Sequence, residues 1–153
     1  MAQPRKVSRS GKDSFHGHGW NGFVDLCAME PLEYLTTVQR KAALAFWYMA
    51  EVINGGHFQY FVNKGYYDHS EVAGALRSLG AVNCAEILTE AMKHYPEGRR
   101  GFPVNVEQYV ENEENAGLDK FDRLFGERGE REVMKCLEEY LAAHESEFIE
   151  WVL

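Results

Sequence analysis

The sequence predicts an all-α fold, a compact single domain of six or seven helices. Apolar residues recur at helical spacing over most of the chain, and helix-capping patterns and glycines separate these stretches. With 153 residues, of which 45% are hydrophobic, the chain can bury a substantial core. We expect the helical domain over residues 25–153 and, before it, a flexible basic arm over residues 1–24, where apolar periodicity is absent.

The most apolar helical stretch, residues 31–54, predicts a central helix. Pro31 suits its first turn, where a missing N–H has no cost. Asn54-Gly55-Gly56 then interrupts the pattern, and glycine adopts left-handed dihedral angles without steric strain. We therefore expect the helix to stop there and the chain to turn sharply into a second helical segment, which contains Phe58 and Phe61.

Capping patterns predict where the following helices begin. Asp68-His-Ser-Glu71 and Asn83-Cys-Ala-Glu86 each fit a capping box, and Gly80 would end the first helix of this antiparallel pair. Apolar residues keep helical spacing to Trp151, which predicts a long last helix that begins at about Glu130.

The negative charge of the chain is concentrated in its last third. Residues 104–153 contain five Lys/Arg and fourteen Asp/Glu, a charge of −9, against −8 for the whole chain. Such a segment repels nucleic acid and attracts basic surfaces, so we expect a basic protein partner and no direct binding of DNA or RNA. The candidate partner-binding carboxylates, which this hypothesis places in one uninterrupted patch, are Glu107, Glu111, Glu113, Glu114, Glu132, Glu138, Glu139, Glu145, Glu147 and Glu150. The alternative is an ordinary solvated face that keeps the protein soluble.

Polar residues also surround the glycine corner, namely Glu51, Asn54, His57, Gln59 and Asn63. One interpretation is a small-molecule or hydrolytic site, with Glu51 or His57 as general base and Asn54 and Gln59 orienting the substrate. The other interpretation is structural, with Asn54 capping the helix and Gln59 satisfying free backbone groups. Because no serine or cysteine nucleophile and no phosphate-binding loop lies nearby, we favour the structural interpretation and expect no enzyme.

Cysteine and histidine usage gives further expectations. Cys27, Cys84 and Cys136 are odd in number and widely spaced, which favours free thiols in a reducing cytoplasm. His16 and His18 have no third or fourth ligand at standard spacing, so we expect no metal and no cofactor. No apolar run is long enough to span a membrane, so we expect no membrane association.

The corner pattern is Glu51-x-x-Asn54-Gly55-Gly56-x-x-Gln59-x-Phe61-x-Asn63, and it occurs together with Ala75-Leu76-x-x-Leu79-Gly80-Ala81 and Leu118-Asp-x-Phe121-Asp122. In this combination the chain resembles the DMP-type DNA-mimic family over roughly residues 30–150. The resemblance implies an all-α fold and a homodimer. From one characterised member it also implies a DNA mimic, whose acidic surface occupies the DNA-binding site of a transcription regulator. We therefore expect the basic partner to be a DNA-binding regulatory protein.

Overall fold

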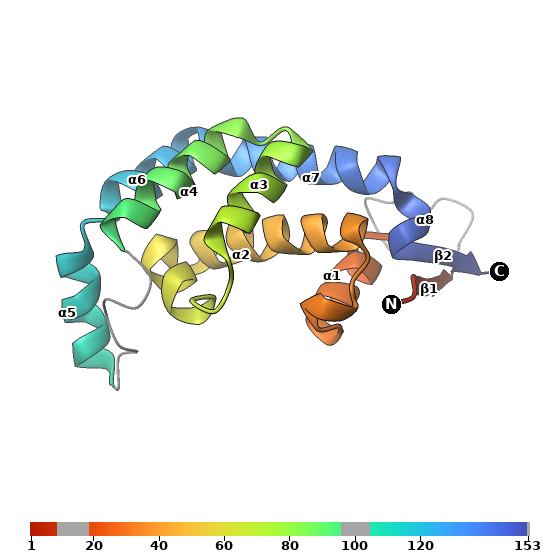
Figure 1. Cartoon of the computed structure of the whole chain (residues 1–153), viewed down its shortest axis with the longest axis horizontal. Coiled ribbons are helices and arrows are strands. Elements are labelled where there is room, and N and C mark those ends of the chain that lie inside the picture. The colour runs from red at the N-terminus through yellow and green to blue at the C-terminus, as the bar shows by residue number, and fades with distance from the viewer. Residues whose placement is uncertain (9–18, 96–104, 153) are drawn as a thin grey trace.

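Helix α2 runs through the middle of the molecule, and the other helices pack around it (Figure 1). The computed structural model describes residues 1–8, 19–95 and 105–152. In chain order the elements are β1 (Arg5–Ser8), α1 (Trp20–Met29), η2 (Leu32–Tyr34), α2 (Thr37–Asn63), α3 (His69–Leu79), α4 (Val82–His94), α5 (Val106–Ala116), α6 (Asp119–Leu124), η3 (Phe125–Gly129), α7 (Glu130–Ala143), α8 (Glu145–Phe148) and β2 (Ile149–Val152). The all-α prediction is confirmed, since only β1 and β2 interrupt the helices of the described part.

The central helix begins later than the sequence predicts. A short 3₁₀ turn, η2, follows Pro31, and α2 itself begins at Thr37. Thr36 caps α2, because its Oγ1 accepts the backbone N–H of Gln39, while Gln39 Oε1 accepts the backbone N–H of Thr36. This reciprocal capping box satisfies two free backbone donors and therefore decides the start of the helix.

The predicted redirection at the glycines is confirmed. Gly55 (φ −158°, ψ 22°) and Gly56 (φ 75°, ψ −178°) leave helical geometry, and the chain resumes a helix that continues to Asn63. A Cβ atom on Gly55 would overlap the Gln59 side chain, and one on Gly56 would lie 2.5 Å from Asp122 Oδ2. Gly55 is therefore needed for space, and Gly56 for space and for its positive φ.

The helical pair α3 and α4 forms as expected, but only one of its two caps is correct. Asp68 accepts the backbone N–H groups of Ser70 and Glu71, whereas the Glu71 carboxylate, expected to complete the capping box, binds Arg40. The cap that ends α3 is Gly80, with φ 97°. The predicted cap by Asn83 is wrong, because α4 begins one residue earlier, at Val82. Glu132 of α7 caps α4 instead, because its carboxylate accepts the backbone N–H groups at the start of this helix.

The prediction of one long last helix is also wrong, because the chain leaves helical geometry at His144 (φ −123°, ψ 28°). A single turn, α8, follows, and then β2 pairs in parallel with β1, with Arg5 opposite Ile149. Residues 1–24 were expected to lack regular structure, but β1 and the start of α1 lie among them. Gly22 of α1 makes room for this small sheet, since a Cβ there would lie 2.9 Å from the Ile149 side chain.

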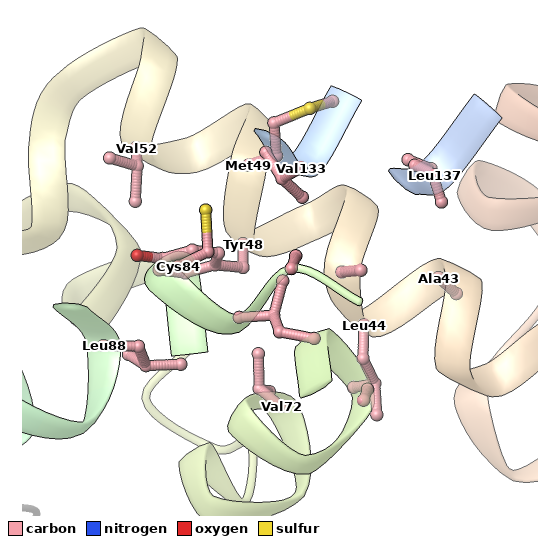
Figure 2. Close-up of a cluster of buried hydrophobic side chains, with 14 of the residues drawn as sticks. Ala43, Leu44, Tyr48, Met49, Val52, Val72, Cys84, Leu88, Val133 and Leu137 are labelled. Carbon is pink, nitrogen blue, oxygen red and sulfur yellow. The ribbon is translucent and has the colours of Figure 1, made fainter. Parts of the chain in front are cut away.

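The core gathers on α2, between α7 and the pair α3 and α4 (Figure 2). Its buried apolar side chains include Ala43, Leu44, Tyr48, Met49, Val52, Val72, Cys84, Leu88, Val133 and Leu137. Among the described residues, no helix is both long and apolar enough to cross a membrane, although α2 has 27 residues.

Candidate functional site

The glycine corner holds a buried chain of polar groups centred on His57. The positive φ of Gly56 turns the chain so that the backbone N–H of His57 donates to Asp122 Oδ1 at 2.8 Å. The Nδ1 atom of His57 lies 2.6 Å from the same carboxylate oxygen, and Nε2 lies 2.8 Å from the Tyr48 hydroxyl oxygen. These contacts fasten α6 to the corner of α2.

This geometry supports the structural interpretation of His57. The side chain is 0% exposed, and both ring nitrogens have protein partners, so it does not meet solvent or a bound water. Burial, more than its neighbours Cys84, Tyr60 and Asp122, raises the pKa of Tyr48, which keeps the phenol protonated. A general base must lie within hydrogen-bonding distance of its substrate, and the buried His57 side chain is not accessible to one.

Glu51 forms a second polar cluster with other residues of the motif. Its Oε2 atom accepts hydrogen bonds from Gln59 Nε2 and Asn63 Nδ2, both at 2.9 Å. The carboxylate therefore ties together the two halves of α2 across the bend. Asn54 does not cap the helix as expected; it is exposed and makes no side-chain hydrogen bond to a described residue. Phe61 is a core residue, 3% exposed.

The ten candidate carboxylates do not form one patch. Those on α5 lie at one end of the long axis of the molecule, and those on α8 and β2 lie at the other (Figure 1). The expectation of an uninterrupted acidic face is therefore wrong. The break after α7 and the separate position of α5 divide the carboxylates, and neither feature is visible in apolar periodicity.

Most carboxylates of α7, α8 and β2 interact within the protein. Glu132 caps α4, Glu138 is half-buried, and Glu139 lies 3.9 Å from Lys135 Nζ.

At the end of the chain, Glu145 accepts the indole N–H of Trp151 at 2.6 Å, and Glu147 accepts the Thr36 hydroxyl at 3.0 Å. Glu150 is exposed, but it stands opposite Lys6 in the sheet register. These carboxylates therefore mainly stabilise the fold and present little unpaired negative charge at the surface.

Three of the four carboxylates on α5 are different, because they face solvent. Glu107, Glu111 and Glu114 are exposed, and their i, i+4, i+7 spacing places them on one face of the helix. On the packed side, the Tyr109 ring contacts Phe58 of α2 with centroids 4.8 Å apart.

Glu51 lies within electrostatic range of α5. Burial raises the pKa of Tyr109, and Glu113 and then Glu51 add to the effect. We call the four glutamates of α5 the acidic end; they are Glu107, Glu111, Glu113 and Glu114.

Comparison with known proteins gives one match: the DMP19-like protein family matches residues 33–144. The chain belongs to the DMP19-like protein family. This confirms the resemblance drawn from the corner pattern. No curated protein matches the chain, and no solved structure does.

In this DMP19-like chain, two members of the polar corner, Tyr48 and Asp122, were not predicted from the sequence. Asp122 does occur in the Leu118-Asp-x-Phe121-Asp122 pattern, which was a usable signal, whereas Tyr48 looks like an ordinary apolar position. In the described part of the chain, no three His, Cys, Asp or Glu side chains are grouped so that they could hold a metal ion. His16 and His18 lie outside the described residues.

Proposed function

We propose that this DMP19-like protein is a non-enzymatic interaction protein whose acidic end binds the basic, DNA-contacting face of a regulatory protein. The observation that carries the proposal is the exposed row of Glu107, Glu111 and Glu114 on α5. Residues 105–117, which contain this helix, include four glutamates and no Lys or Arg. The segment therefore presents negative charge that its own side chains do not neutralise.

The physical basis is charge complementarity. A DNA-binding face presents Lys and Arg side chains placed to contact phosphates, and these contacts supply much of its affinity. On α5, Glu107 and Glu111 are separated by about 6 Å along the helix axis, and Glu111 and Glu114 by about 4.5 Å. A helix holds these charges in a fixed pattern, which lets them meet basic side chains without first losing the entropy of a flexible loop.

The proposal assigns no binding role to the carboxylates at the other end of the molecule. Glu132, Glu145 and Glu147 already accept hydrogen bonds from the protein itself. The proposal includes a cytoplasmic location, which the three free thiols support, because free cysteines suit a reducing compartment.

A capture experiment tests the proposal. Immobilised wild-type protein is incubated with proteins of the source organism that have been enriched on DNA-cellulose. We expect specific capture in low salt, strong loss of capture in high salt because exposed charges are screened within about 10 Å at 0.1 M, and release by added duplex DNA.

The matched variant carries Glu107→Gln, Glu111→Gln and Glu114→Gln, which remove charge but keep side-chain size. It is expected to capture little. Equal capture by wild type and variant, or capture that duplex DNA does not reverse, would count against the proposal.

A further inference from the structure

A groove of about 760 Å³ lies between α1, α2 and the segment that joins α2 to α3. Its floor is one face of α2, formed by Arg40, Leu44 and Trp47 at i, i+4 and i+7. One wall runs from the end of α1 through η2, and the other from Lys64 to Glu71. The groove is therefore built from helix ends and a turn around a rigid helical floor.

The lining of the groove includes three aromatic rings and four carboxylates. Beside Trp47, the rings of Tyr66 and Tyr67 pack edge to face with centroids 4.8 Å apart, and Tyr66 is 73% exposed. The charged lining residues are four carboxylates and two cations: Glu30, Glu33, Asp68, Glu71, Arg40 and Lys64. Glu30 also pairs with Arg5, whose Nη1 lies 3.0 Å away, so the carboxylates at the groove exceed the cations by one. An aromatic site with an excess carboxylate favours a cationic occupant.

The groove already contains both kinds of basic head group, each supplied by the chain itself. The Lys64 ammonium lies 4.2 Å from the centroid of the Trp47 ring and 5.6 Å from that of Tyr67. The Arg40 guanidinium donates through Nε and Nη2 to the two carboxylate oxygens of Glu71. These contacts show how the groove would hold an ammonium or guanidinium group from outside.

We propose that the groove receives an arginine side chain from the basic partner, with its guanidinium stacked on Trp47 in the place that the Lys64 ammonium occupies. Arginine suits this site better than lysine, because the guanidinium is planar, weakly hydrated and able to stack while it still donates to carboxylates. Glu33, which is exposed on the groove wall, remains available to an incoming cation. This inference rests on the proposed function, because the arginine side chain comes from the same basic partner that binds α5.

Glu51 connects the groove to the acidic end. It lies four residues beyond Trp47, on the same face of α2. Burial and Tyr66 are the larger causes that raise the pKa of Tyr67 in the groove, and Glu51 contributes to the same shift. Tyr109 of α5 packs onto Phe58, which lies in the second half of the same helix. We therefore expect a single extended basic segment to contact both the groove and α5.

The test uses octa-arginine as the probe and the indole N–H signals of the protein as the readout. The chain has three tryptophans, and the spectrum of a Trp47→Phe variant assigns the signal of Trp47. On titration of the wild-type protein, we expect the Trp47 signal to shift while those of Trp20 and Trp151 stay in place. An unmoved Trp47 signal at saturating probe, or no binding of the probe at all, overturns the inference.

Lys64→Met provides the decisive variant, because it keeps the apolar stem and removes the resident cation. If a guanidinium takes the place of the Lys64 ammonium, this variant binds octa-arginine about five-fold more tightly than wild type, and Trp47→Leu binds it about five-fold more weakly. If Lys64→Met binds octa-arginine no more tightly than wild type does, the contact between Lys64 and Trp47 only anchors the turn. If octa-glutamate instead moves the Trp47 signal and Lys64→Met abolishes that shift, the groove binds anions. Either result overturns the inference.

The variant with three glutamines on α5 separates this inference from the proposed function. If octa-arginine shifts Trp47 and binds the triple variant as tightly as wild type, the groove is supported and the role of α5 fails. If the triple variant loses affinity but Trp47 never shifts, α5 is supported and the groove fails.

Discussion

Gly56→Ala is expected to lower the free energy of unfolding by about 2.5–4.5 kcal/mol, since it disturbs both the backbone and the polar corner. Gly56 has φ 75° and ψ −178°, a combination essentially restricted to glycine. Forcing alanine into it costs on the order of 1–3 kcal/mol. The new Cβ would also lie 2.5 Å from Asp122 Oδ2, so the carboxylate has to move.

The displaced carboxylate accounts for the second part of the cost. Asp122 Oδ1 accepts the backbone N–H of His57 and lies 2.6 Å from its Nδ1 atom. A hydrogen bond to a charged group contributes about 1.5–3 kcal/mol, and the lower end applies here because solvent screens a partly exposed carboxylate. The Asp122 side chain is 33% exposed.

Urea unfolding followed by circular dichroism measures this cost. For a chain of this length, a loss of about 4 kcal/mol lowers Tm by roughly 8–16 °C. Gly74→Ala is the matched control, because Gly74 lies within α3 with nothing within 4 Å of a new Cβ. It is expected to raise stability by about 0.5–1 kcal/mol.

A Gly56→Ala protein whose stability stays within about 1 kcal/mol of wild type would refute the role assigned to the corner. A double-mutant cycle sharpens the test. Asp122→Ala removes the group that the new methyl meets, so the double variant should lose less stability than the sum of the two single variants. Strict additivity would mean that Gly56 and Asp122 do not interact.

Three further predictions concern other parts of the molecule. Glu132→Ala removes the acceptor for the first N–H groups of α4, at Asn83 and Cys84, and should lower stability in urea by about 0.5–2 kcal/mol; an unchanged unfolding midpoint would contradict this. A hydrogen bond from Arg40 holds the pKa of Glu71 below its ordinary value. The stability from this pair is therefore fully present above about pH 4.5 and is lost as the pH falls through the lowered pKa. Arg40→Met should flatten this loss in acid titrations of stability, and identical acid profiles would argue against the pair. We also propose a homodimer, so sedimentation velocity should give twice the chain mass of 17.5 kDa; one chain mass at every concentration would exclude it.

Features that depend on neighbouring residues could be predicted from the sequence. The redirection at Gly55 and Gly56, the cap at Asp68 and the left-handed residue Gly80 each follow from local sterics and hydrogen bonding. Apolar periodicity also predicted the all-α class and the central helix, because the buried face of α2 faces the core along its length.

Features that depend on distant partners could not be predicted. Glu132 caps a helix that begins 50 residues earlier in the chain, and β1 pairs with β2 at the opposite end of the sequence. The contact of His57 with Asp122 joins residues 65 positions apart.

The prediction of a single acidic patch failed for the same reason. A helical projection of Glu132 through Glu150 assumes one continuous helix, but the helix ends at Ala143. The position of the acidic end depends on how α5 packs through Tyr109 onto Phe58, and apolar periodicity does not reveal that contact.

Displacement of DNA tests the central claim most directly. A captured DNA-binding protein is bound to a fluorescent duplex, and the wild-type chain or the variant with Gln at 107, 111 and 114 is titrated in while anisotropy is followed. If the α5 carboxylates occupy the phosphate-binding face, wild type releases the duplex at low salt and the variant does not. Equal release by both proteins, or a ternary complex in which the duplex stays bound, would contradict the account.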